Sequence, residues 1–349
     1  MKKPYALRPG DKVAIVSLSR GMLGEEAFYH KYLLAKERME TLYGLQVVPM
    51  PNALKGIDHL YRHPEARAED LMTAFRDPEI RAVFNAIGGD DTIRLLPYVD
   101  LSVLRDNPKI FTGFSDTTTN HFMLYKAGVV SYYGLSVMNQ WGEYVQINPY
   151  TKGFIDQMLF DPPQQLEIPC SSFCSYDCHK IWWDAAHMDR ATPRFPCSGY
   201  QVLQGRGRVR GQLLGGCIDV FPELLGTSLW PSPEDWRGKL LLLETSESDM
   251  SEDLLTSLLR NLQAQGIFQV IRGILVGRPA FQEKESVYQQ VYRRVIGLEA
   301  GLPELPILFG VSVGHAYPTG ILPVGLTYEL DADAGSLRLT EPATRRREE

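Results

Sequence analysis

The chain alternates segments of strand and helix character, and this alternation restricts the fold more than any other feature. An apolar, β-branched run at 11–19 precedes apolar residues at helical spacing over 25–44. The same order recurs along the front half, with strands expected at 45–51, 82–89 and 109–115 and helices at 64–79, 91–99 and 117–128. Repeated units of this kind predict a Rossmann-like parallel sheet covered by helices. Ligands of such sheets bind beyond the carboxyl ends of the strands, so functional residues should follow strands.

A second series of strands and helices follows an irregular stretch. Between about residue 160 and residue 205 the periodicity disappears, and prolines, cysteines and aromatic residues crowd together. Because 349 residues exceed what one hydrophobic core usually serves, we predict an α/β fold of two domains. The predicted parts are an N-terminal domain at 1–160, a linker or substrate loop at 161–205 and a C-terminal α/β domain at 206–349. In the last part we expect strands at 207–216, 239–247, 270–277 and 305–315, and a hairpin within 322–343.

The composition is that of an ordinary globular protein. Hydrophobic residues make up 44% of the chain and charged residues 22%, which excludes a disordered chain and a collagen-like repeat. Thirty-six basic against forty-two acidic residues give a net charge of −6. A nucleic acid polymer or an anionic membrane is therefore not the expected partner, and a small peptide or another small molecule fits better. No apolar stretch approaches the roughly 18 residues that span a bilayer.

The N-terminus and the cysteines indicate a cytoplasmic protein. Two lysines open the chain, but a proline and a Gly-Asp pair interrupt the apolar run, so we expect no secretory signal. Five cysteines are an odd number, and four of them lie in the irregular stretch rather than along a disulfide framework. The spacing of Cys170, Cys174, Cys178, His179 and Cys197 fits a zinc site poorly. We therefore expect reduced thiols, no metal and no cofactor.

The segment 109–128 carries the clearest catalytic signal. An apolar strand ends at Gly113, Ser115 and Asp116 follow, and a helix starts at once. This is the layout of a nucleophile elbow, in which a tight turn lifts a serine hydroxyl clear of the sheet and a helix N-terminus supplies N–H groups for an oxyanion. Thr117 stands where the usual elbow has glycine. The alternative is that Ser115 or Asp116 only caps the helix.

A neighbouring strand ends in a second candidate element. Gly88 and Gly89 close the strand at 82–89, and Asp90 precedes the next helix. Glycines at a strand end let the backbone approach a ligand closely. A backbone N–H of Gly89 or Asp90, together with that of Asp116, is therefore predicted to form a two-donor oxyanion hole. The alternative is an ordinary strand-to-helix turn with an acidic cap.

Candidates for a general base and its orienting acid lie in the back half. Among seven histidines, His315 follows an apolar strand and precedes a turn, as a presented loop residue would. Glu244 leaves the apolar strand at 239–247, and a carboxylate fixed on a strand holds a histidine better than one on a flexible loop. Glu247 and Asp249 are nearby alternatives for the acid. The plainer interpretations are a structural turn histidine and a charged strand end.

Six ordered motifs make the chain similar to a known family. They are AIGGDDTIRLLPYVD, GFSDTTTNHFMLYKAGVVSYYGLSVM, LQGRGRVRGQLLGG, LLLETSE, GILVGRP and GHAYPTGILPVG. Together they span nearly the whole chain and resemble the LD-carboxypeptidase family of serine peptidases. The resemblance implies a triad across two domains, with Ser115 as nucleophile, Glu244 as orienting acid and His315 as general base. It also implies an oxyanion hole at the glycine turn and at the N–H after the serine, and a homodimer.

Within this family the chain most resembles the microcin C self-immunity (MccF-like) branch, through GGDD, LETSE and GRP. That branch hydrolyses the amide between an aminoacyl or peptidyl group and a nucleotide, and stacks the base on an aromatic residue of the interdomain loop. The resemblance implies that Trp182 or Trp183 takes this role; the alternative is that both only pack the loop. Cys217 and Ala316 depart from the branch pattern, which leaves the substrate open.

Three functions are therefore retained. The leading one is hydrolysis of an aminoacyl- or peptidyl-nucleotide conjugate. The second is an LD-carboxypeptidase that trims a murein tetrapeptide. The third is a nucleotide-binding module without catalysis, against which the first strand leads into SLSRGMLG rather than into the spaced glycines of a dinucleotide fingerprint.

Overall fold

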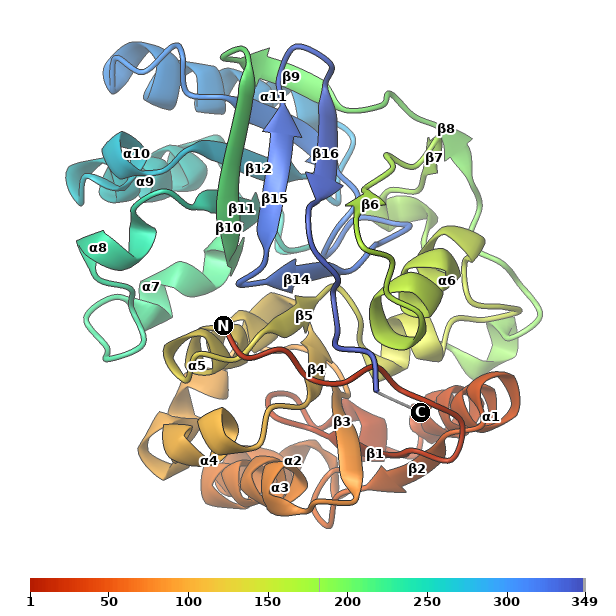
Figure 1. The fold of residues 1–349 in the computed structure, drawn as a ribbon. Coiled ribbons are helices and arrows are strands. Elements are labelled where there is room, and N and C mark those ends of the chain that lie inside the picture. The colour runs from red at the N-terminus through yellow and green to blue at the C-terminus, as the bar shows by residue number, and fades with distance from the viewer. Residues whose placement is uncertain (182, 348–349) are drawn as a thin grey trace.

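The computed structural model describes residues 1–181 and 183–347 and contains two large sheets, one below the other in Figure 1. The front half of the chain builds most of a six-stranded sheet, and the back half builds most of an eight-stranded sheet. This confirms the predicted α/β fold with a Rossmann-like N-terminal part. Within the described ranges, no helix combines the length and the apolar character that a membrane span needs.

The six-stranded sheet has the order β14-β5-β4-β3-β1-β2. Strand β1, next to the edge strand β2, pairs in parallel with both neighbours, so that Ala14 lies opposite Val48 on one side and Val83 on the other. The core strands are buried almost throughout, as their continuous apolar runs predict. The strands are β1 (Lys12–Val16), β2 (Gln46–Pro49), β3 (Ile80–Asn85), β4 (Ile110–Gly113), β5 (Ser131–Tyr133) and β14 (Leu322–Val324).

Helical segments connect the strands of this sheet largely where the periodicity predicts them. The expected helix at 91–99 is a 3₁₀ segment, and Pro97 inside it lacks the N–H that an α-helix needs there. The segments are η1 (Met22–Gly24), α1 (Tyr29–Tyr43), α2 (Gly56–Arg62), α3 (Pro64–Arg76), η2 (Thr92–Tyr98), α4 (Leu101–Asp106), η3 (Ser115–Thr117), α5 (Thr118–Lys126) and η4 (Val137–Trp141).

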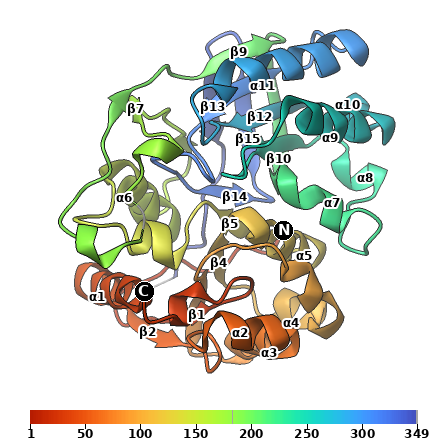
Figure 2. The same ribbon diagram turned by 180° about the vertical axis from the view of Figure 1, so that it is seen from behind.

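The eight-stranded sheet has the order β6-β16-β15-β10-β11-β12-β13-β9. Strands β10 to β13 are parallel, and β15 and β16 form the expected hairpin, with Asp331 opposite Ser336. Figure 2 shows α9, α10 and α11 grouped beside this sheet. The strands are β9 (Gln201–Gln204), β10 (Arg208–Cys217), β11 (Leu240–Glu244), β12 (Gly273–Gly277), β13 (Ile307–Val311), β15 (Thr327–Asp331) and β16 (Ser336–Leu339). The helical segments are η8 (Ile218–Val220), α7 (Phe221–Leu224), α8 (Pro233–Trp236), α9 (Glu252–Ala264), α10 (Ile267–Val270), α11 (Lys284–Tyr292) and η9 (Arg293–Glu299).

Strand β14 joins the two halves of the chain. It follows β13 in sequence but pairs antiparallel with β5 in the six-stranded sheet, with Leu322 opposite Tyr133. The C-terminal tail also returns to the front half, where Ala6 N–H donates to the Arg345 carbonyl at 2.8 Å. The loop 312–321 is consequently stretched between both sheets.

The irregular stretch contains short structural elements rather than a single loop. Its β6 extends the eight-stranded sheet at one edge, and β9 extends it at the other. The division at residues 160 and 205 stays a prediction. The elements around it are α6 (Pro149–Ile155), η5 (Asp156–Phe160), β6 (Leu166–Glu167), β7 (Phe173–Cys174), η6 (Asp177–His179), η7 (Ala185–His187) and β8 (Phe195–Pro196).

Candidate active site

Ser115 lies on a strained turn between β4 and α5. Its φ of 63° is in the left-handed region, which costs a non-glycine residue on the order of 1–2 kcal/mol. Neither Ser115 nor Asp116 caps the helical segment with its side chain, because the cap residue is Phe114 and it makes no side-chain bond. The strained backbone supports the elbow interpretation of this segment.

Two features hold the elbow against the loop after β3. Gly88 packs so closely that a Cβ there would lie 2.7 Å from the Ser115 Cβ, so only glycine fits. The buried Asp116 side chain crosses to the same loop, and its Oδ2 accepts from the Asp91 N–H at 3.0 Å and the Thr92 N–H at 2.9 Å. The Ser19 hydroxyl donates to the same oxygen. Asp116 therefore fixes three loops at the carboxyl edge of the sheet.

The three amides predicted for the oxyanion hole lie around this close contact. Gly89 and Asp90 are exposed where the loop after β3 turns, and the Asp116 amide lies 3.4 Å from the Cβ position of Gly88. In the described part of the chain, no acceptor is recorded for the N–H groups of Gly89, Asp90 or Asp116. These donors are free for a ligand oxygen.

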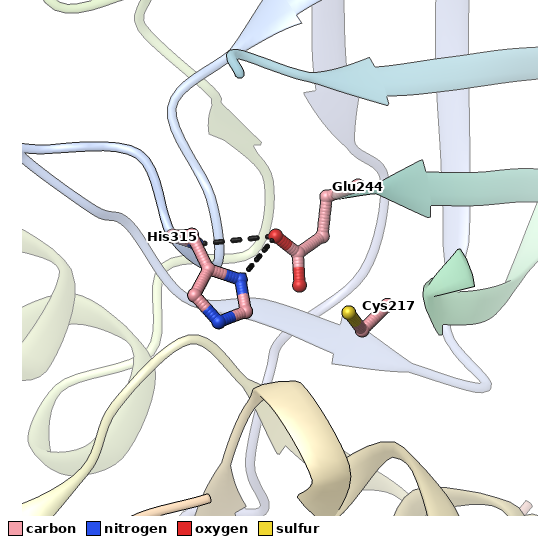
Figure 3. Close-up of side chains that lie close together, drawn as sticks. All are labelled: Cys217, Glu244 and His315. Atoms are coloured by element: carbon pink, nitrogen blue, oxygen red, sulfur yellow. Dashed lines mark hydrogen bonds and ion pairs between the residues drawn. The ribbon is translucent and has the colours of Figure 1, made fainter. Parts of the chain in front are cut away.

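Glu244 and His315 form a buried hydrogen-bonded pair (Figure 3). Glu244 ends β11, and its Oε2 accepts from His315 Nδ1 at 2.8 Å and from the His315 backbone N–H at 3.1 Å. The chain passes directly over the carboxylate at Gly314, where a Cβ would lie 2.4 Å from the Glu244 Cδ. The two bonds from one residue fix both the position and the tautomer of the imidazole.

Tyr133 connects this pair to the serine turn, and it was not among the residues predicted from the sequence. The Tyr133 hydroxyl donates to Glu244 Oε1 at 2.5 Å and accepts from the Ser115 backbone N–H at 3.3 Å. Tyr133 ends β5, so its position at a strand end was the available signal. One phenol thus links residues from the two halves of the chain.

Glu247 pairs with the other ring nitrogen of His315, and its Oε2 lies 2.9 Å from Nε2. Burial opposes a charge on the imidazole, but the carboxylates of Glu244 and Glu247 outweigh it and raise the pKa of His315 to about 10. The hydrogen bond to His315 lowers the pKa of Glu247 to about 2. The two carboxylates therefore favour the protonated form of His315, and within the described ranges no hydrogen bond joins His315 to the Ser115 hydroxyl.

One cavity of about 480 Å³ brings the serine and the histidine together, and Ser115, His315, Glu247 and Trp183 all line it. Phe114, next to the serine, lies edge-on to the imidazole with ring centroids 5.0 Å apart. The Trp183 indole N–H donates to Asn139 Oδ1 at 2.9 Å. The other tryptophan predicted for base stacking, Trp182, lies outside the described residues.

Cys217 completes a group of possible metal ligands with Glu244 and His315 (Figure 3). It lies opposite Glu244 in the parallel pairing of β10 and β11, and ligand atoms of the three residues are within 4.8 Å of one another. Glu244 and His315 are already paired with each other, so this proximity is accounted for without an ion. Among the described residues the loop cysteines form no such group; Cys197 Sγ, for instance, donates to the Ser171 carbonyl at 3.4 Å.

Comparisons with known proteins cover both halves of the chain. The LD-carboxypeptidase N-terminal domain matches residues 13–134, and the LD-carboxypeptidase C-terminal domain matches residues 210–330. The structure of an MccF-like protein from Streptococcus pneumoniae in complex with AMP is 33% identical and superposes with a TM-score of 0.87 over 95% of this chain and 98% of that one. The microcin C7 self-immunity protein MccF of Escherichia coli is 25% identical over 79% of this chain and 78% of that protein. A Bacillus subtilis protein described as a probable murein peptide carboxypeptidase is 29% identical over 93% of this chain and 89% of that protein.

Proposed function

Because the chain belongs to the LD-carboxypeptidase family of serine peptidases, we propose that it hydrolyses an amide bond with Ser115, His315 and Glu244 as a catalytic triad. One observation carries this proposal. The strained serine after β4 and the Glu244-bound histidine after β13 line the same cavity, although they come from different sheets.

The residues divide the reaction among them as follows. The Ser115 hydroxyl attacks the carbonyl carbon of the scissile amide, and His315 Nε2 accepts its proton and passes it to the leaving amine. Water, deprotonated by His315, then cleaves the acyl–serine ester, which releases the acid and restores the Ser115 hydroxyl. Glu244 keeps the imidazole oriented, and the Tyr133 hydroxyl holds the second oxygen of that carboxylate. The N–H groups of Asp116 and of Gly89 or Asp90 receive the oxyanion.

Glu247 has to leave His315 before this reaction starts. Nε2 can accept the serine proton only when its lone pair is free. In the structure the same nitrogen shares a proton with Glu247. The Glu247 side chain is half-exposed on the loop after β11, so it has room to move. Substrate that enters the cavity is proposed to displace it.

The substrate that we propose is an aminoacyl or peptidyl group joined to a nucleotide. The 33% identical relative was solved in complex with AMP. In this chain Trp183 lines the cavity with the serine and presents an indole on which a base can stack. The nucleotide is the leaving group, and its amine receives the proton from His315.

A murein tetrapeptide is the second candidate substrate. The Bacillus subtilis relative with that description aligns over 93% of this chain, which is more than MccF of Escherichia coli does. The cavity also contains cationic side chains, among them Arg20 and Lys31, that suit a peptide carboxylate. Both substrates use the same triad and differ in the leaving group.

The experiment that tests the proposal compares the two substrates directly. Purified protein is incubated with an aspartyl sulfamoyl adenosine and, separately, with a murein tetrapeptide, and the products are identified by mass spectrometry. A fluorophosphonate probe is expected to label Ser115. Release of sulfamoyl adenosine supports the leading substrate, and release of the terminal amino acid supports the second. Turnover of neither substrate with no label at Ser115 contradicts the proposal.

A further inference from the structure

Lys31 is a buried cation in the wall of the cavity. It lies in the first turn of α1, is 2% exposed and lines the same cavity as Ser115. Its Nζ lies 3.9 Å from the centre of the Tyr144 ring. A buried ammonium normally pairs with an anion, because it loses its hydration on burial.

No anion in the described part of the chain pairs with Lys31. Its Nζ takes part in no ion pair and no side-chain hydrogen bond there, and the Tyr144 ring face is its one recorded contact. The carboxylate of Glu143 acts on the charge of Lys31, but both its oxygens have other donors. Oε1 accepts from the Tyr317 hydroxyl, and Oε2 accepts from the Asn148 N–H at 3.0 Å.

The charges around Lys31 leave an excess of positive charge. Arg38 lies close by, and its guanidinium donates to the backbone carbonyl of Trp141 at 2.9 Å rather than to a carboxylate. The N-terminal end of α1 adds a partial positive charge, which is unfavourable for a lysine in the first turn. Burial first, and then Arg38, lower the pKa of Lys31 to about 7, against the effect of Glu143. An anion bound in the cavity would remove this imbalance.

We infer that Lys31 binds an anionic group of the substrate, either the phosphate of a nucleotide or the carboxylate of an acidic acyl side chain. The inference rests on the proposed function, because it assigns a subsite of the same cavity. Both groups present oxygen acceptors that an ammonium at the cavity wall can bind. Phe28 neighbours both Trp183 and Lys31. Its ring centroid lies 6.0 Å from that of the Trp183 indole, and its backbone carbonyl accepts from the Lys31 backbone N–H at 2.9 Å.

The test measures ligand binding in protein that carries Ser115→Ala, so that nothing is hydrolysed. Lys31→Met removes the charge at nearly constant volume, and Lys31→Arg restores a charge. Lys36→Met is the matched control, because Lys36 lies on the same helix but pairs with Glu40. The probes are AMP against adenosine, and aspartyl against leucyl sulfamoyl adenosine; inorganic phosphate serves as the simplest anion.

Lys31→Met is expected to weaken one anionic probe relative to its neutral partner by about tenfold to a hundredfold, the range for a hydrogen bond to a charged group. If the substitution lowers the affinity for AMP relative to that for adenosine, Lys31 binds the phosphate. If it lowers the affinity for the aspartyl compound relative to that for the leucyl compound, Lys31 binds the acyl carboxylate. Lys31→Arg should recover part of the loss, and Lys36→Met should change neither ratio.

Proton uptake on ligand binding is a second measurement, and a change in packing alone would not alter it. At pH 8 the empty site holds a largely neutral Lys31, so an anion that binds there draws a proton onto it. Calorimetry of the chosen probe in two buffers of different ionisation enthalpy should show uptake that Lys31→Met abolishes. The other titratable groups at this place, Arg38, Glu143, Tyr144, His30 and Asp184, remain in the variant and serve as the background.

The inference is overturned if both ratios in Lys31→Met stay within twofold of the parent, or if the parent binds none of the anionic probes. Failure of the proposed function looks different. In that case protein with an intact Ser115 hydrolyses neither substrate, while AMP and inorganic phosphate still report on Lys31.

Discussion

The cavity-lining residues around His315, called the catalytic end, and those around Lys31, called the α1 end, differ in how completely their polar groups are paired. At the catalytic end, His315 has a carboxylate on each ring nitrogen, and Glu244 receives bonds from His315 and Tyr133. At the α1 end, Lys31 has an aromatic ring but no anion among the described residues. Among the described residues, His315 and Glu244 are therefore paired without substrate, whereas Lys31 has no anion.

This difference separates two tasks. Because His315 and Glu244 are already paired, the catalytic end is expected to gain little from ground-state binding, and its contacts are expected to count mainly in the transition state. The α1 end has a lysine without an anion among the described residues and includes Trp183, so it is proposed to supply substrate affinity. Energy from that remote contact is available to move Glu247 away from His315. Substitutions at the catalytic end should therefore alter kcat, and substitutions at the α1 end should alter substrate affinity.

The largest effect is expected from Ser115→Ala. Loss of the nucleophile should lower kcat about 10⁴- to 10⁶-fold, as in other serine enzymes. AMP affinity and the melting temperature should stay close to those of the parent, because the hydroxyl makes no hydrogen bond in the described structure. Steady-state kinetics and calorimetry on one preparation check both. Residual activity above a tenth of the parent would exclude Ser115 as nucleophile.

Glu244→Gln comes next. An amide in place of the carboxylate keeps the shape but loses the charge that stabilises the imidazolium, and kcat should fall about 10³- to 10⁴-fold. The measurement is kcat at saturating substrate, with circular dichroism as the folding control. If Glu247→Gln gave the larger loss instead, Glu247 would be the orienting acid, and the roles of the two carboxylates would have to be exchanged.

Trp183→Ala tests the α1 end. Loss of a stacking platform should weaken AMP binding by about 1–3 kcal/mol, or roughly tenfold to a hundredfold. Saturated kcat should change much less, and Trp183→Phe should restore most of the affinity. Calorimetry with AMP measures the first effect. A fall in kcat at unchanged affinity would contradict the division between the two ends.

Glu247→Gln is expected to have the smallest effect on the maximal rate but a clear effect on its pH dependence. In the proposed mechanism the base is neutral His315, so activity is expected to rise as pH rises through the His315 pKa, which two carboxylates raise to about 10. With one carboxylate removed, the acid limb of the kcat/KM profile should move to lower pH by about 1–3 units. Glu247→Asp keeps the charge as the control, and an unmoved limb would show that Glu247 does not govern this pKa.

The sequence predicted the parts of the site that depend on strand ends. Glu244 and His315 were proposed because each follows a continuous apolar run; their side chains are hydrogen-bonded in the structure, and their catalytic roles stay a prediction. The sequence did not predict that Glu247, rather than Ser115, contacts His315 Nε2. Glu247 is a loop residue, and the position of its side chain depends on tertiary packing. Lys31 gave no signal, since a lysine on a helix is usually solvated and only burial makes it unusual.

The fold was likewise predicted where local sequence patterns determine it. Local periodicity placed most strands and helices, and the correct hairpin at β15 and β16 followed from a short-range turn. Strand β14 was missed as a member of the front sheet, because pairing with β5 is decided by long-range packing that local sequence does not encode. The 3₁₀ form of η2 was signalled by Pro97 but not recognised.

Strand β14 also has a consequence for biosynthesis. The front sheet emerges from the ribosome with β5 as an open edge, and that edge receives its partner only after residue 324 has been translated. An unpaired strand edge offers its backbone groups to any other extended chain. The nascent front half is therefore expected to depend on chaperones until late in translation, and a product truncated before β14 should aggregate instead of persisting as a separate domain.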